Sequence, residues 1–211
     1  SGLVKPYTIK EADGVRIGFF GVMGKDSADD APFASPVKFK DPIAVSKEMV
    51  RLLREDEKAD IVVCLSHSGL SRGSHSEDEI LAKEVPGIDI IISGHSHTEL
   101  SEPIISGNTI IVQAGSYGQN LGILDITFSN GKAALKNYRL AAIDSSIPDD
   151  AAVKSTIDSF ITMINNRVLQ KHNLKYLQVI GKTGFDLTKI EAEAAIGNLL
   201  ADAIKWQANR F

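Results

Sequence analysis

The stretch IVVCLSHSG, residues 61–69, decides the fold of this chain, together with the similar stretch IISGHSH at residues 91–97. Each begins as a short apolar run and ends in histidine set among serine and glycine. A short apolar run without alternation is typical of a strand that is buried on both faces, as in a parallel sheet. The two stretches therefore predict two parallel strands, each followed by a polar loop that carries histidine.

The sequence before and between these strands has the pattern of helices. Asp41 and Pro42 are a typical helix cap and first helical residue, and apolar residues follow them at helical spacing. Ser76 and Glu79 have the spacing of a capping box. An earlier apolar run at residues 15–22 predicts one more buried strand. The order strand, helix, strand, helix, strand indicates an α/β fold with a parallel sheet and right-handed crossovers.

The character of the sequence changes after residue 104. Gly107–Asn108 and Asn130–Gly131 are typical hairpin turns. The segments beside the second turn, LGILDITF (121–128) and ALKNYRL (134–140), favour antiparallel strands. We therefore expect a mixed sheet.

The C-terminal part is expected to be mainly helical. Residues 149 to about 171 have the apolar periodicity of a long amphipathic helix, long enough to join two domains. Residues 176–180 predict a strand, and residues 191 to about 209 a second helix. This tail is too short to close a hydrophobic core of its own.

Composition narrows the class of protein. The 211 residues are 43% hydrophobic and 24% charged, which is typical of a globular protein and argues against disorder. No apolar run approaches the roughly 20 residues that a transmembrane helix needs. The net charge of −4 argues against a nucleic-acid partner, so we expect a small-molecule one. The single cysteine, Cys64, lies in an apolar run and is expected to be a buried hydrophobic residue.

Three histidines are candidate metal ligands: His67, His95 and His97. All follow the carboxyl ends of predicted parallel strands, and open parallel sheets bind ligands at that edge. Neutral imidazole is a good ligand for zinc, manganese and related ions. A single histidine at a strand end is more often a hydrogen-bonded loop residue than a ligand. Three of them at two related strand ends favour a metal site.

Other polar features are assigned no catalytic role. His75 lies in a polar stretch and His172 at the end of the predicted long helix. The glycine-rich segment AGSYG (114–118) is interpreted as a turn between strands rather than as a phosphate-binding loop. Asp60 and Asp89 begin their strands, at the edge opposite the histidines, and are expected to be structural.

The motif LSHSG, followed by GIDIIISGHSHT and then VQAGSYGQNLGILDI, resembles the later half of the calcineurin-like metallophosphoesterase domain of 5′-nucleotidases. The closing stretch EAAIGNLLADAI resembles the start of that family's C-terminal nucleotide-binding domain. The resemblance implies part of a four-layer α/β/β/α sandwich with a mixed sheet, followed by a long linker helix. It divides the chain into the metallophosphoesterase part at 1–147, the linker helix at 148–173 and the beginning of the C-terminal domain at 174–211.

The same resemblance implies a binuclear site. His67 and His95 would bind one divalent ion and His97 the other, with zinc or manganese preferred and cobalt or iron also accepted by such ligands. Two metals about 3.5–4 Å apart activate a water that attacks phosphorus. The implied substrates are nucleotides, cyclic nucleotides or nucleotide sugars. The implied location is periplasmic, cell-surface or secreted.

The chain departs from the family pattern because the earlier motifs Asp-x-His, Gly-Asp and Gly-Asn-His are absent. In the family these supply a bridging aspartate, further ligands and a histidine that assists the transition state. We expect them upstream of Ser1, in an N-terminal part of the same domain. The chain is therefore expected to be a fragment that has no catalytic residue of its own, no identified substrate-binding residue and little activity alone.

Several functions remain open at this point. Within the family, a 2′,3′-cyclic phosphodiesterase, a nucleotide-sugar hydrolase or a thiosulfohydrolase would carry the same motifs. A non-catalytic domain that keeps the fold and uses its surface for binding is the alternative from a different class.

Overall fold

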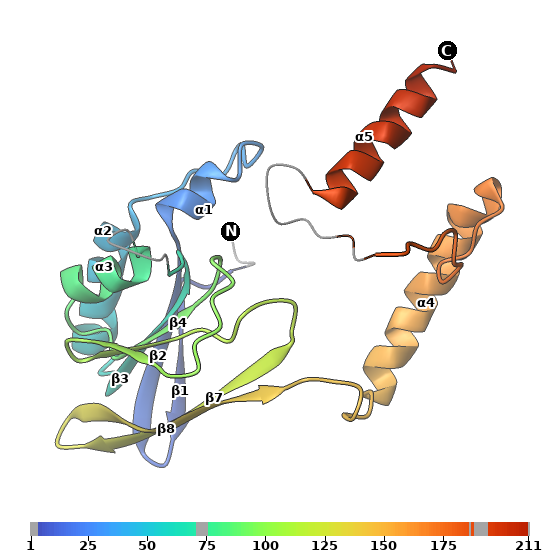
Figure 1. Ribbon diagram of the computed structural model, residues 1–211. Coiled ribbons are helices and arrows are strands. Elements are labelled where there is room, and N and C mark those ends of the chain that lie inside the picture. Colours follow the sequence, from blue (N-terminus) through green and yellow to red (C-terminus); the bar gives the residue numbers. More distant parts are fainter. Residues whose placement is uncertain (1–3, 71–75, 186, 188–193, 211) are drawn as a thin grey trace. The chain divides into compact units, whose positions relative to one another are not determined.

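The structure, a computed structural model, describes residues 4–70, 76–185, 187 and 194–210 (Figure 1). The chain divides into two compact units, residues 1–147 and 148–211. Each unit is described by itself below. The histidines singled out above as candidate ligands all belong to the first unit.

The first unit is built on a six-stranded mixed sheet with the order β1-β2-β3-β4-β6-β5. Its four central strands are parallel, and an antiparallel strand lies at each edge. The strands are β1 (Tyr7–Ala12), β2 (Val15–Met23), β3 (Ile61–His67), β4 (Ile90–Ser93), β5 (Ile104–Ser106) and β6 (Thr109–Val112). The parallel strands and the mixed character of the sheet confirm the prediction.

Strand β1 was not predicted. It forms a hairpin with β2, joined by Asp13 and Gly14, whose φ angles of 51° and 78° are both positive. An Asp-Gly pair is the typical two-residue hairpin turn, and it follows the alternating segment YTIKEA. The signal was therefore present in the sequence, in the turn rather than in the apolar run.

Two helices cover one face of the sheet (Figure 1). Helix α2 (Pro42–Arg51) begins where the Asp41 carboxylate accepts a hydrogen bond from the Ala44 amide at 2.7 Å, and a π-helical turn, η1 (Leu52–Asp56), continues it. Helix α3 (Glu77–Glu84) begins where the Ser76 hydroxyl accepts from the Glu79 amide at 3.4 Å. Both caps confirm the prediction. The core between helices and sheet includes Phe20, Val50, Leu53, Val62, Cys64, Leu81, Val85, Ile91 and Ile111.

A second sheet lies on the other face. It is the hairpin of β7 (Asn120–Ser129) and β8 (Lys132–Ala142), with the predicted turn at Asn130–Gly131. Its apolar residues pack on the side chains of the first sheet that point away from the helices. This core contains Ile61, Val63, Ile90, Val15, Ile17 and Phe19 from the first sheet and Leu124, Ile126, Phe128 and Ala133 from the second. The described residues of the first unit thus form three layers: helices, sheet and sheet.

Arg54 forms hydrogen bonds at the amino ends of the adjacent parallel strands β3 and β4. Its guanidinium donates to the Asp60 carbonyl at 2.6 Å, the Gly87 carbonyl at 3.0 Å and the Asp89 carboxylate at 2.5 Å. The same carboxylate accepts from the Val62 amide at 2.6 Å. The Asp60 carboxylate accepts from the Arg16 amide at 2.8 Å, so the structural roles expected of Asp60 and Asp89 are confirmed.

The second unit contains α4 (Ala151–Arg167), a short 3₁₀ helix, η2 (Leu169–His172), and α5 (Ala195–Ala208). The predicted long helix thus ends in a 3₁₀ turn rather than continuing to residue 171. The strand predicted at residues 176–180 is wrong, since this segment is turn and coil. A strand needs a hydrogen-bonding neighbour, and the described residues of this unit contain no other strand to provide one. The predicted start of the second helix, Glu191, lies outside the described residues.

The apolar side chains of the second unit are largely exposed, and none of its described residues is buried. This agrees with the expectation that the tail closes no core of its own. None of the helices that the structure describes is long and apolar enough to cross a membrane.

Candidate metal centre

His67 and His95 lie side by side at the carboxyl edge of the parallel sheet. His67 is the last residue of β3, and His95 comes two residues after the end of the adjacent strand β4. Their ring centroids are 5.2 Å apart and the ring planes are tilted by 60°. The structure therefore brings together two of the three histidines that the sequence singled out.

The separation of these two rings fits a shared metal ion. A zinc ion about 2.1 Å from one nitrogen of each ring, at a tetrahedral angle of about 109°, would place the ring centres about 5 Å apart. His67 is exposed and His95 partly exposed, so an ion in solution can reach them. Among the described residues, however, no group of three or more His, Cys, Asp or Glu side chains could hold a metal ion. Two imidazoles alone are too few to complete a metal site, so the role of His67 and His95 as ligands stays a prediction.

His97 has a different neighbour. Its ring lies edge-on to that of Tyr117, with the centroids 5.5 Å apart. Tyr117 belongs to the segment AGSYG, which was predicted from the sequence to be a turn between strands. The role of His97 as a ligand stays a prediction.

The loop that carries His95 and His97 has an unusual backbone. Their φ angles are +65° and +55°, in the left-handed region that residues other than glycine seldom adopt. Such a conformation costs about 1 kcal/mol or more for each residue and persists only where the surroundings impose it. Conformations of this kind cluster at active sites and ligand clamps, so the backbone supports a functional role for this loop.

Gln113, at the end of β6, holds this loop from beneath. Its side chain is 2% exposed. Its amide nitrogen donates to the Ser93 hydroxyl at 2.6 Å and to the Gly94 carbonyl at 3.1 Å, and its amide oxygen accepts from the Thr98 backbone amide. The Ser96 hydroxyl lies within hydrogen-bonding distance of both ends of the amide, at 3.1 and 3.3 Å. One buried amide therefore fixes both ends of the loop.

Asp78, on α3, holds the loop that follows His67. Its fully buried carboxylate accepts from the Ser66 hydroxyl at 2.5 Å and from the Gly69 amide at 3.2 Å. Burial raises the pKa of the Asp78 carboxyl, while hydrogen bonds from Ser66, Ser93 and Gly69 oppose that rise. Neither Gln113 nor Asp78 was singled out from the sequence.

A short helix, α1 (Lys25–Asp29), packs against the same edge. The His67 carbonyl accepts from the Ser27 hydroxyl at 2.5 Å and from the Gly24 amide at 3.1 Å. Just after this helix, the Asp30 carboxylate lies 4.0 Å from Nε2 of His95. Asp30 was not among the residues singled out from the sequence. The sequence feature that could have indicated Asp30 is the acidic segment DSADD (26–30), which follows another strand of the parallel sheet, β2.

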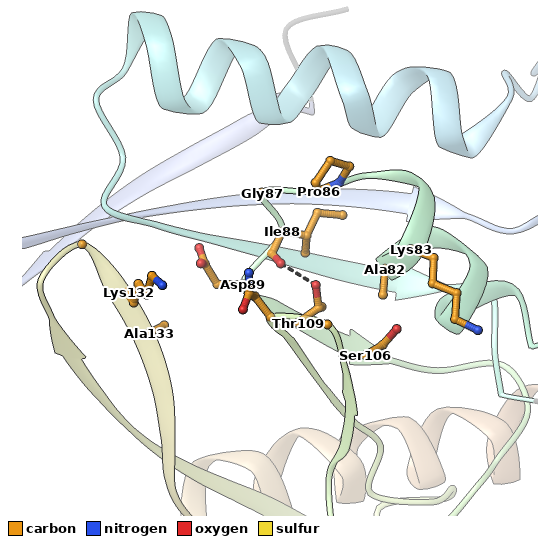
Figure 2. Close-up of a pocket in the computed structure, with 13 residues that line it drawn as sticks. Ala82, Lys83, Pro86, Gly87, Ile88, Asp89, Ser106, Thr109, Lys132 and Ala133 are labelled. Carbon is orange, nitrogen blue, oxygen red and sulfur yellow. Dashed lines mark hydrogen bonds between the residues drawn. The ribbon is translucent and has the colours of Figure 1, made fainter.

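A pocket of about 440 Å³ lies at the opposite ends of these strands (Figure 2). Lys83 and Lys132 lie on its two sides, and the Thr109 hydroxyl donates to the Ile88 carbonyl at 2.7 Å (Figure 2). The Asp89 carboxylate in its lining is already bound by Arg54. The described residues that line this pocket include no cluster of metal-ligating side chains. The histidine edge, and not this pocket, is therefore the candidate metal centre.

The chain is similar to several known proteins. Residues 8–99 match the sequence profile of the calcineurin-like phosphoesterase family. The trifunctional nucleotide phosphoesterase YfkN of Bacillus subtilis is 28% identical over 211 residues, which cover 97% of this chain and 14% of that protein. The 5′-nucleotidase of Diplobatis ommata is 26% identical, over 98% of this chain and 37% of that protein.

A solved structure of similar fold is the 5′-nucleotidase precursor of Thermus thermophilus, with a TM-score of 0.76 and 24% identity. The match covers 97% of this chain and 42% of that one. This chain therefore spans less than half the length of each of these relatives.

Proposed function

We propose that this chain, whose residues 8–99 belong to a calcineurin-like phosphoesterase domain, is part of a metal-dependent phosphoester hydrolase of the 5′-nucleotidase type. Such an enzyme converts a nucleotide into a nucleoside and phosphate. The observation that carries the proposal is the pair of His67 and His95 rings, 5.2 Å apart at the carboxyl edge of a parallel sheet. The homologues, which are 5′-nucleotidases and related phosphoesterases, support it.

Two divalent ions, zinc or manganese, are the proposed cofactors. When bound, they would supply an activated water and neutralise charge on the phosphoryl group. In this chain, His67 and His95 would each offer a ring nitrogen to one ion, and we assign His97 to the other. The Asp30 carboxylate, 4.0 Å from Nε2 of His95, lowers the cost of positive charge at this edge.

We further propose that the remaining ligands come from an N-terminal part of the same domain, outside these 211 residues. The reason is charge and ligand count, because three neutral imidazoles offset none of the positive charge of two divalent ions and leave each ion short of ligands. The parts of the chain at 148–173 and 174–211 are proposed to be the linker helix and the beginning of the C-terminal domain. By resemblance to the family, we place the protein in the periplasm, on the cell surface or outside the cell.

The test compares phosphate release from AMP by two proteins, the 211-residue chain and the longest reading frame that contains it, with Mn²⁺ or Zn²⁺ present. We expect turnover by the longer protein, a loss of roughly 100-fold or more in its His95→Ala variant, and little turnover by the chain alone. Robust turnover by the 211-residue chain would contradict the need for outside ligands.

A panel of other substrates separates the alternatives within the family. It contains a 2′,3′-cyclic nucleotide, a nucleotide sugar and a thiosulfate ester. If the longer protein binds nucleotide and metal but hydrolyses none of the panel, a non-catalytic binding domain is the correct interpretation.

A further inference from the structure

The loops that carry His67 and His95 are each held beneath the surface by a buried polar side chain, Asp78 on one side and Gln113 on the other, and Ser93 interacts with both. On the His67 side, the Asp78 carboxylate accepts from Ser66 and Gly69, which flank the histidine. On the His95 side, the Gln113 amide binds Ser93 and Gly94, which precede the histidine. Ser93 lies between the two halves: its hydroxyl accepts from the Gln113 amide at 2.6 Å, and its interaction with Asp78 lowers the pKa of that carboxyl.

The chemistry of this network is unusual for a hydrophobic interior. Asp78 is 0% exposed and Gln113 2% exposed, and burying such groups is costly unless every polar atom is paired. Here both ends of the Gln113 amide and both oxygens of the Asp78 carboxylate have hydrogen-bond partners. Fully paired buried networks of this kind fix one geometry, because any shift leaves a buried polar group unpaired.

The loop on the His95 side needs such a restraint. The left-handed backbone of His95 and His97 is held only if both ends of the segment are fixed. Gln113 meets this need with a single side chain, because it binds the Gly94 carbonyl before the segment and the Thr98 amide after it.

We infer that Asp78, Ser93 and Gln113 form a positioning network that sets the separation and orientation of the His67 and His95 rings. The inference deepens the proposed function and rests on it, because the geometry that the network sets is the one that fits a shared ion. These residues touch neither metal nor substrate. They act through the two loops in which the histidines lie.

The test uses three variants and a matched control in the 211-residue chain. Asp78→Asn and Gln113→Met each remove one end of the network, and Ser93→Ala removes its centre with the smallest change in volume. The control is Thr109→Val, which deletes a buried hydroxyl that bonds to the Ile88 carbonyl at 2.7 Å at the other end of the same sheet. It weakens the same sheet without touching either histidine loop.

The first readout needs no metal. Rings whose centroids are 5.2 Å apart should give a proton NOE between His67 and His95 in the NMR spectrum of the unmodified chain. We expect this NOE to fall several-fold in the network variants and to persist in Thr109→Val. An unchanged NOE in folded Ser93→Ala and in whichever of the other two variants folds would overturn the inference.

The second readout is affinity for Mn²⁺ alone, measured by titration of the longest reading frame that contains the chain and of the same variants made in it, because the chain alone lacks the remaining proposed ligands. We expect roughly a 10- to 100-fold loss in the network variants, as is typical when groups that orient metal ligands are removed, and no loss in the control. If the unmodified chain shows the NOE but the longer protein binds no Mn²⁺, the proposed metal site fails while the positioning network stands. If the longer protein binds Mn²⁺ and its variants bind it equally well with the NOE intact, the network fails while the metal site stands.

Discussion

Replacement of Arg54 by methionine should destabilise the first unit strongly without changing the histidine edge. The Arg54 guanidinium donates to the carbonyls of Asp60 and Gly87 and to the Asp89 carboxylate, so one side chain links the starts of β3 and β4. Methionine keeps most of the apolar length of the side chain and removes every donor. The change therefore isolates the polar contribution of Arg54.

The magnitude follows from the burial of the pair. The side chains of Arg54 and Asp89 are 29% and 17% exposed, so their ion pair at 2.5 Å is partly desolvated. A hydrogen bond to a charged group contributes about 1.5–3 kcal/mol, and the variant also leaves a half-buried carboxylate without its cation. We expect the free energy of unfolding to fall by about 2–4 kcal/mol.

The assay is urea unfolding followed by far-ultraviolet circular dichroism, in a double-mutant cycle with Asp89→Asn. We expect a coupling energy of about 1–2 kcal/mol between the two positions. The control is Lys47→Met, which removes an exposed ion pair with Glu84 at 4.0 Å and should change the unfolding free energy by less than about 0.5 kcal/mol. A coupling energy near zero, or equal effects of Arg54→Met and Lys47→Met, would show that the Arg54–Asp89 ion pair does not stabilise the first unit.

Three further predictions concern the core and the loop after β3. In Gly24→Ala the new Cβ would lie 2.5 Å from Cα of Ser68, so the free energy of unfolding measured in urea should fall by about 1–3 kcal/mol. In the control Gly21→Ala the nearest atom to the new Cβ is 3.7 Å away, so the unfolding free energy should hardly change. Equal effects of the two substitutions would count against this packing. Burial raises the pKa of the Cys64 thiol, so a disulfide reagent at pH 8 should label it only after unfolding, and rapid labelling of the native chain would be inconsistent with the core. Burial also raises the pKa of Asp78 above its ordinary 3.8, so the native state holds this proton more tightly than the unfolded chain; the contribution of Asp78 to stability is greatest below pH 3.8 and is lost as the pH rises through the raised pKa. As the pH rises from 3.8 through the raised pKa of Asp78, the unmodified chain should therefore lose stability relative to Asp78→Asn. If the difference in unfolding free energy between the two proteins does not vary with pH, the protonation of Asp78 is not linked to folding.

Local signals predicted most of the first unit. The apolar runs that became β3 and β4, the caps at Asp41 and Ser76 and the turn at Asn130–Gly131 each act within a few residues, so they can be recognised without knowing the tertiary structure. The meeting of His67 and His95 followed from topology, because adjacent parallel strands end at the same edge. The sequence and the geometry of a parallel sheet were enough to predict these strands, caps, turn and histidine positions.

The residues that the sequence did not reveal act over long distances in the chain. Asp78 binds Ser66, twelve positions earlier, and Gln113 binds Ser93, twenty positions earlier. A buried Asp or Gln has the same appearance in a sequence as an exposed one, so its role emerges only when the elements are packed. The strand predicted at residues 176–180 was wrong for a related reason, since a strand depends on a neighbour that the sequence of the segment does not specify.

His67 and His95 together are proposed to bind one divalent metal ion. This is tested by a Mn²⁺ titration of the longest reading frame that contains the chain, with isotopically labelled histidine, followed by NMR, because a bound Mn²⁺ broadens the signals of nearby rings. We expect the ring signals of His67 and His95 to broaden together at substoichiometric Mn²⁺, and the His67 signal of the His95→Ala variant to need several-fold more Mn²⁺ to broaden. Broadening of one ring without the other, or an equal response of His67 in the variant, would show that the two rings do not share an ion.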